Sequence, residues 1–207
     1  MENFSYTGFN NFDRILIKML DQSYKSPNTR NHIGDWKYNS SISNETAAIF
    51  INDNKKEAVY AIKGTSNKKE LLLDLKLSLF TNIFSNKLMN RTQMNKSLEH
   101  FRRVSSILNN RYKIFITGHS LGGIKALYIS KTFPVHTGTI FNTFVPGTMK
   151  PDLRLLFTQN RRLKMVIARG DILSNNITLI RRDVVSIVPP LLKQSILSHS
   201  ISELKKY

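Results

Sequence analysis

The chain of 207 residues contains no cysteine, which excludes disulfide bonds, thiolate metal sites and a cysteine nucleophile. This composition agrees with a reducing compartment. The chain also lacks an apolar run of the about 18 to 20 residues that a membrane-spanning helix needs. Its N-terminal stretch has neither the basic flank nor the apolar segment of a signal peptide. We therefore expect a cytoplasmic protein, and a place at a membrane surface or in a virus stays open.

Acidic residues are scarce, because 14 Asp and Glu stand against 31 Lys and Arg, which gives a formal net charge of +17. Such a charge attracts polyanions, namely nucleic acid, anionic lipid head groups or an acidic partner. The basic residues form scattered pairs with no run of five or more, a pattern that is also typical of a well-solvated surface. The charge alone therefore selects no partner, and it predicts no oligomeric state.

Glycine and proline are also few, at 9 and 6 residues, and no linker rich in them divides the chain. The length suits one domain, spanning 1–207, with a sizeable core. Its first half predicts a helix over 12–24, a hairpin of strands over 45–51 and 57–63, and helices over 69–80 and 93–108. Its second half alternates strands over 113–117, 139–145 and 163–168 with helices over 121–132 and 151–159. This alternation favours the α/β class, with a mostly parallel sheet flanked by helices.

The sequence Gly118–Gly122 satisfies the pattern G-x-S-x-G, with Ser120 at its centre. A β-rich run precedes it and a segment of helical periodicity follows it, which is the arrangement of a nucleophile elbow. Glycines allow the strand and helix backbones to approach closely there. The residues that would frame this elbow are Gly118, His119, Gly122 and Gly123. The alternative is an ordinary helix cap in which Ser120 merely caps the helix.

A serine hydroxyl needs a base to act as a nucleophile, and the base needs a carboxylate that orients it. Hydrolases with this elbow carry the three residues in the chain order Ser, Asp or Glu, His. Only His136 and His199 follow Ser120. No acidic residue lies between Ser120 and His136, so we predict His199 as the base.

Four acidic residues are candidates for the orienting carboxylate, namely Asp152, Asp171, Asp183 and Glu203. Asp171 closely follows the strand predicted over 163–168, and open α/β sheets build their sites at the carboxyl ends of strands. Asp152 belongs to a predicted helix start, and Asp183 lies in the basic tail. We therefore predict Asp171.

Several segments resemble the class 3 lipase family, the fungal-type triacylglycerol lipases and their relatives, which are α/β-hydrolases. The similarity covers, in family order, Ala61–Ser66, Leu73–Leu75, Thr117–Gly123, Phe141–Gly147, Gly170–Leu173 and His199–Ile201. This resemblance implies that Ser120 is the nucleophile, Asp171 the orienting acid and His199 the general base. It also implies an oxyanion hole that is formed by the backbone N–H groups of Thr65 and Leu121.

The sequence departs from the family at two basic positions. Lys63 stands where the family usually has Arg, and Lys125 stands where it prefers a small or apolar residue. We expect the helix face around Lys125 to be exposed or lined by a carboxylate. The apolar segment 77–89 lies near the presumed mouth, and its side chains Leu77, Phe80, Ile83 and Phe84 are candidates for a lid or acyl groove, with a packed core helix as the alternative.

The resemblance implies a lipase-type serine hydrolase that cleaves carboxylic esters of lipids, either acylglycerols or phospholipids, with no metal and no organic cofactor. The net charge favours peripheral contact with an anionic membrane. The alternative is a catalytically silent α/β-hydrolase domain that binds nucleic acid through its basic surface or builds an assembly, because fold does not determine function.

Overall fold

The computed structural model describes residues 10–64, 91–143, 155, 157–158, 162–168, 184–187 and 201–205. These form a seven-stranded sheet whose strands lie in chain order. The strands are β1 (Lys37–Tyr38), β2 (Ala47–Asn52), β3 (Glu57–Ile62), β4 (Lys113–His119), β5 (Gly138–Phe141), β6 (Leu163–Ala168) and β7 (Val184–Ile187). The pairs among β1, β2 and β3 are antiparallel, and the pairs from β3 to β7 are parallel. The mostly parallel sheet predicted from the sequence is confirmed.

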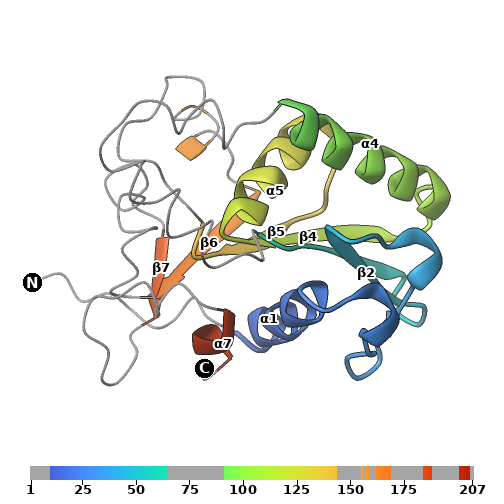
Figure 1. Cartoon of the computed structure of the whole chain (residues 1–207), viewed down its shortest axis with the longest axis horizontal. Helices are drawn as coiled ribbons and strands as arrows, with labels where there is room; N and C mark the ends of the chain where they lie inside the picture. The colour runs from blue at the N-terminus through green and yellow to red at the C-terminus, as the bar shows by residue number, and fades with distance from the viewer. Residues whose placement is uncertain are drawn as a thin grey trace, which may run out of the picture.

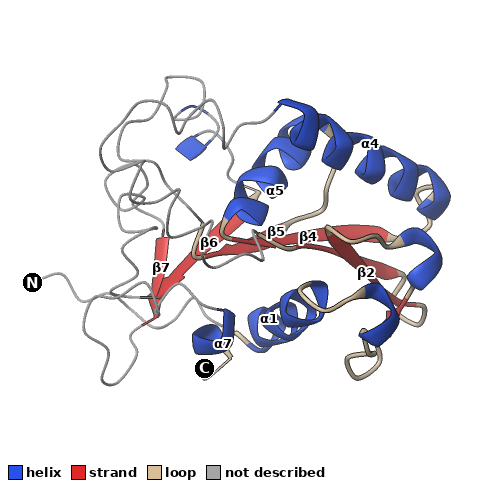
Figure 2. Cartoon of the chain, in the orientation of Figure 1, coloured by secondary structure: helices blue, strands red, loops and turns tan. Residues whose placement is uncertain are grey.

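Helices cover both faces of the sheet (Figure 1). Helices α4 (Arg91–Leu108) and α5 (Leu121–Thr132) lie on one face, and α1 (Asn11–Ser23) with α7 (Ile201–Leu204) lies on the other. Short 3-10 turns, η2 (Pro27–Thr29) and η3 (Ser40–Ile42), flank β1. Each face has its own apolar core cluster. The red sheet between two blue layers in Figure 2 is therefore buried from both sides, which explains why β4 reads as a nearly continuous apolar run.

The predicted hairpin and three of the predicted helices are confirmed as β2–β3, α1, α4 and α5. The strand predicted over 139–145 is too long, because β5 ends at Phe141. The next residue, Asn142, has a left-handed φ of 41°, and its side-chain oxygen accepts a hydrogen bond from the Ala168 N–H at 2.7 Å. The helix predicted over 69–80 lies outside the described residues.

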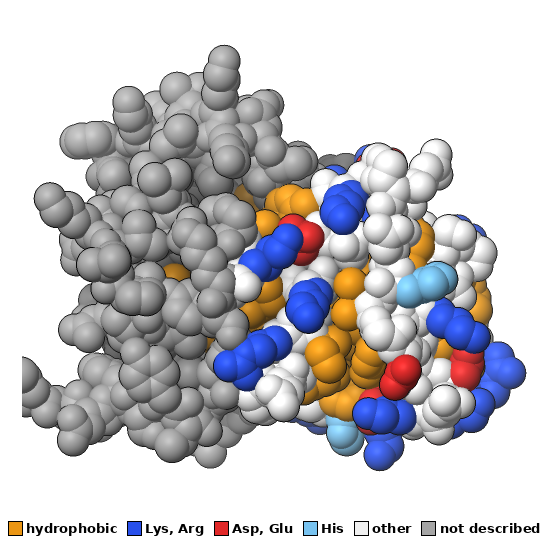
Figure 3. All heavy atoms as spheres, turned by 90° about the horizontal axis from the view of Figure 1, so that it is seen from below, with side chains coloured by type: hydrophobic (Ala, Val, Ile, Leu, Met, Phe, Trp, Pro, Cys, Tyr) orange, Lys and Arg blue, Asp and Glu red, His pale blue; other side chains and the backbone are white. Residues whose placement is uncertain are grey.

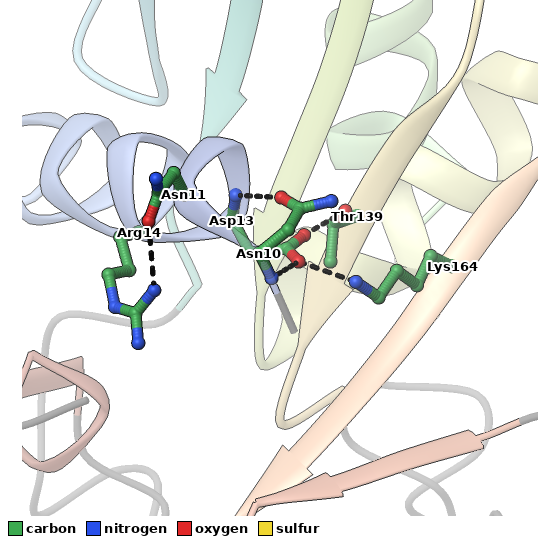
Figure 4. Close-up of polar contacts among 6 residues, drawn as sticks. All are labelled: Asn10, Asn11, Asp13, Arg14, Thr139 and Lys164. Atoms are coloured by element: carbon green, nitrogen blue, oxygen red, sulfur yellow. Dashed lines mark hydrogen bonds and ion pairs between the residues drawn. The ribbon is translucent and has the colours of Figure 1, made fainter. Parts of the chain in front are cut away.

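One carboxylate fastens the start of α1 to the sheet (Figure 4). Asn10 and Asp13 form a capping box, in which each side chain accepts from the backbone N–H of the other. The Asp13 carboxylate also accepts from the Thr139 hydroxyl on β5 at 2.8 Å and pairs with the Lys164 ammonium on β6. Asp13 is only 2% exposed, so its charge depends on these partners.

We expect Asp13→Ala to lower the free energy of unfolding by about 3 kcal/mol, because it leaves buried donors and the Lys164 charge without their partner. The matched control is Asp21→Ala on the same helix. Among the described residues, the Asp21 carboxylate pairs with the Lys205 ammonium alone, at 3.0 Å, near the surface, and its loss should cost less than about 1 kcal/mol. Urea unfolding measures both, and equal losses would contradict this account of the helix anchor.

A histidine of α4, His100, is hydrogen-bonded to the hairpin strand β3 and to the turn η3. The Nε2–H of His100 donates to the Ile42 carbonyl at 3.1 Å, so its Nδ1 accepts from the Tyr60 hydroxyl at 2.6 Å. Burial lowers the pKa of His100, the hydrogen bond to Ile42 acts in the opposite direction, and the charge of Arg103 lowers the pKa further. The folded chain therefore binds a proton at His100 less readily than the unfolded chain does.

This depressed pKa makes stability depend on pH. Above the unfolded pKa of about 6.5 the neutral ring is present in both states, and the stability is fully retained. As the pH falls from about 6.5 through the folded pKa, the unfolded chain takes up a proton that the folded chain resists, and stability is lost. We expect His100→Gln to flatten the fall of unfolding free energy between about pH 7 and about pH 5. A variant whose pH profile parallels that of the wild type would exclude His100 as the source.

Candidate active site

Ser120 occupies a strained position at the junction of β4 and α5. Its φ of 57° and ψ of −124° are unusual for a residue with a side chain, and such a conformation costs about 1–3 kcal/mol. Backbone contacts hold it there, because the Ser120 N–H donates to the Phe141 carbonyl at 3.2 Å and the Gly123 N–H donates to the Ser120 carbonyl at 3.0 Å. The structure thus has a sharp turn from strand to helix at Ser120, with a positive φ.

The hydroxyl of Ser120 is buried and has no hydrogen-bond partner among the described residues. Ser120 stands at the N-cap position of α5, but its side chain makes no capping hydrogen bond, so the hydroxyl does not serve to cap the helix. A buried polar atom without a partner costs about 1–3 kcal/mol. Strain and an unpaired hydroxyl on one residue are both unfavourable for stability, and both are typical of a functional atom. The residue is 3% exposed, so neighbouring atoms must move before a substrate reaches Oγ.

Two glycines of the motif allow the elbow to close. A Cβ on Gly118 would overlap the carbonyl group of Gly122, and a Cβ on Gly122 would overlap the Ile62 carbonyl oxygen on β3. The first turn of α5 therefore lies directly on β4 and on the end of β3. Gly123 faces the buried Thr143 side chain after β5 in the same close manner.

The segment after β3 lies against Ser120. Gly64, two residues beyond β3, lies so close to the elbow that a Cβ there would be 2.9 Å from Ser120 Cβ and 2.7 Å from the His119 carbonyl oxygen. On the other side, Leu121 is the first residue of α5, where the backbone N–H has no acceptor within the helix. A developing oxyanion would also gain from the positive end of the α5 dipole.

Tyr24, the residue that follows α1, was not predicted from the sequence as part of this site. Its hydroxyl oxygen accepts from the Gly64 N–H at 2.8 Å and is 2.7 Å from His119 Nδ1. Its ring meets the His119 ring edge-on, with centroids 5.7 Å apart. Burial raises the pKa of Tyr24, and the bond from Gly64 opposes this to a smaller extent. No motif surrounds Tyr24, so no sequence signal could have identified it.

Lys125 differs from its expected environment. It is half-buried rather than exposed. Burial lowers its pKa, and so does the charge of Lys63, which lies beyond the end of β3. Within the described part of the chain, neither lysine has a carboxylate partner. Two positive charges therefore lie near each other beside the elbow.

The remaining predicted residues lie outside the described part of the chain. They are Thr65, Leu77, Phe80, Ile83, Phe84, Asp171 and His199. Among the residues that the structure does describe, no group of three or more His, Asp or Glu could hold a metal ion. No described helix combines the length and the apolar character that crossing a membrane requires.

The strain at Ser120 predicts an unusual effect of glycine there. Ser120→Gly should raise the free energy of unfolding by about 1 kcal/mol, because relief of the positive φ exceeds the added entropy of the unfolded chain. The control is Ser106→Gly, an exposed position within α4, which should lose about 0.5 kcal/mol of helix propensity. Thermal and urea unfolding compare the two, and equal destabilisation by both changes would show that Ser120 is not strained.

Solved structures share this fold. A lipase from Rhizopus microsporus var. chinensis superposes with a TM-score of 0.56 at 16% identity, over 84% of this chain and 69% of that one. A mutant of MDLA from Penicillium cyclopium superposes with a TM-score of 0.51 at 13% identity, over 88% and 80% of the two chains. At such identities the likeness shows the fold alone, which is that of the α/β-hydrolases. No protein-family model and no curated protein sequence matches this chain.

Proposed function

We propose that this chain is a lipase-type serine hydrolase, which cleaves carboxylic esters of lipids. The observation that carries this proposal is Ser120, whose buried hydroxyl is unpaired among the described residues and whose backbone is strained at the turn from β4 into α5. A stabilising structural role would require a partner for that hydroxyl or a relaxed backbone. Nucleophilic attack requires a free hydroxyl, held at a sharp turn above the sheet.

Asp171 is the proposed orienting acid, and the sheet topology supports this role. Strand β6 ends at Ala168, and Asp171 follows it by three positions in the sequence. Strands β4, β5 and β6 are parallel neighbours. Their carboxyl ends therefore share one edge of the sheet, the edge at which α/β folds bind their ligands.

His199 is the proposed general base, and the packing of α7 supports this role. His199 precedes Ile201, the first residue of α7, by two positions, a span of at most about 7 Å. Helix α7 is anchored to α1 through the buried Leu204 and through the pair of Lys205 with Asp21. Helix α1 ends at Ser23, next to the Tyr24 side chain that contacts the elbow.

The proposed reaction uses these groups in two steps. Ser120 Oγ attacks the ester carbonyl while His199 takes the hydroxyl proton, and Asp171 holds the imidazole in position. The N–H groups of Leu121 and Thr65 would stabilise the oxyanion, and each would lower the activation barrier by on the order of 3 kcal/mol. The alcohol leaves with the proton from His199. A water activated by His199 then releases the acid and restores the serine.

The proposed substrate is an acylglycerol or phospholipid ester at a lipid surface. The net charge of +17 supports peripheral contact with an anionic membrane, where each basic residue near the surface contributes about 1 kcal/mol. Basic side chains are spread over the α1 face, with acidic ones sparser (Figure 3). The charges of Lys63 and Lys125 beside the elbow favour an anionic head group. Leu77, Phe80, Ile83 and Phe84 are proposed to line the acyl groove or a lid.

The test is labelling by a fluorophosphonate probe together with hydrolysis of a graded ester series, with and without a lipid dispersion because Oγ is buried. We expect the wild type to be labelled and to hydrolyse esters, and Ser120→Ala to lose at least about 1000-fold in rate. The matched control is Ser130→Ala, a second buried serine, whose hydroxyl donates to the Leu127 carbonyl within α5. Ser130→Ala should retain both labelling and hydrolysis.

A folded wild type that is neither labelled nor active under either condition would contradict the proposal. If the same protein retained DNA in a salt-dependent manner, the silent basic domain would be the better account.

A further inference from the structure

The hydroxyl of Tyr24 lies between two backbone segments of the proposed site. The Gly64 N–H can only donate, so the phenol oxygen accepts that bond, at 2.8 Å. The same oxygen lies 2.7 Å from His119 Nδ1, the distance of a second hydrogen bond. The Tyr24 hydroxyl therefore links the Gly64 backbone to the His119 side chain.

Each end of this chain of hydrogen bonds adjoins a residue of the proposed reaction. His119 directly precedes the nucleophile Ser120, and Gly64 directly precedes Thr65, the proposed oxyanion donor. A Cβ on Gly64 would lie 2.9 Å from the Tyr24 hydroxyl oxygen and 2.9 Å from Ser120 Cβ. Tyr24 thus bridges the end of β3 and the elbow at the point of their contact.

The backbone that carries Tyr24 is itself well anchored. Its N–H donates to the carbonyl groups of Asp21 and Gln22, which closes the last turn of α1. The first turn of α1 is fastened to β5 and β6 through Asp13. A hydroxyl held in this way can fix the separation of two segments that are 40 and 95 positions away in the sequence.

We propose that Tyr24 is a positioning residue, which sets the distance between the oxyanion donor after Gly64 and the nucleophile after His119. This inference rests on the proposed hydrolase function. Tyr24 touches neither substrate nor reacting atoms; it acts through the two backbone segments. Because a misplacement of about 1 Å can cost about 100-fold in rate, the effect belongs in kcat rather than in substrate binding.

The experiment compares Tyr24→Phe with Tyr60→Phe. The two tyrosines are matched, because both are deeply buried and each hydroxyl is hydrogen-bonded to the Nδ1 of a histidine, at 2.7 Å and 2.6 Å. Tyr60 lies in the middle of β3, paired with Ile116, and its histidine is on α4. We expect both variants to lose stability. Only Tyr24→Phe should lose kcat, by at least about tenfold, with KM changed by less than about twofold.

A second pair of variants tests the hydrogen-bond partner of Tyr24 and remains informative if Tyr24→Phe does not fold. The side-chain amide of His119→Asn can take the place of Nδ1 as hydrogen-bond partner, as donor or acceptor, whereas His119→Leu offers neither. We expect the asparagine variant to keep at least about tenfold more kcat than the leucine variant, because only it preserves the bond with Tyr24. Equal losses in the two would overturn the positioning role.

The outcomes separate this inference from the function on which it rests. A wild type without labelling or ester hydrolysis overturns the proposed function, and the positioning role falls with it. An active wild type, in which Tyr24→Phe matches Tyr60→Phe in kcat, overturns the positioning role alone.

Discussion

The whole site depends on one backbone constraint, the positive φ of Ser120 between the last residue of β4 and the first turn of α5. The chain must reverse there within a single residue, and it does so only because Gly118 and Gly122 leave room for backbone against backbone. This reversal buries the serine hydroxyl without a partner among the described residues. It also places the first residue of α5 directly after the serine. Strand β4 is paired in parallel with β3 and with β5. These neighbours hold the turn in place, so the rest of the fold offsets the cost of the strained backbone.

Helix α1 links this strained turn to the remainder of the sheet. Its first turn is fixed by a buried carboxylate against β5 and β6, and Tyr24, the residue that follows it, supplies the hydroxyl between the end of β3 and the elbow. Helix α7 packs on the same helix, shortly after the proposed base in the sequence. The N-terminal helix is therefore more than a cover for the sheet, because it connects the segments that carry the proposed nucleophile, oxyanion donor and histidine.

The sequence predicted those parts whose information is local. The G-x-S-x-G motif between an apolar strand and a periodic helix identified Ser120, and alternating segments identified the parallel sheet. The length of β5 was wrong, because Asn142 ends the strand through a bond to Ala168, a contact across the sheet that no local pattern encodes. Tyr24, and the proximity of Lys63 to Lys125, were not predicted for the same reason. The roles of Asp171 and His199 remain predictions from chain order and resemblance.

The most direct measurement is a crystal structure of the wild type with a phosphonate bound covalently to Ser120. The account predicts that the His199 imidazole lies within about 3.2 Å of the serine oxygen. It also predicts that the phosphonyl oxygen accepts from the N–H groups of Thr65 and Leu121 at about 2.7–3.1 Å. A phosphonylated serine with the histidine out of reach, or with its oxygen facing no backbone donor, would contradict it.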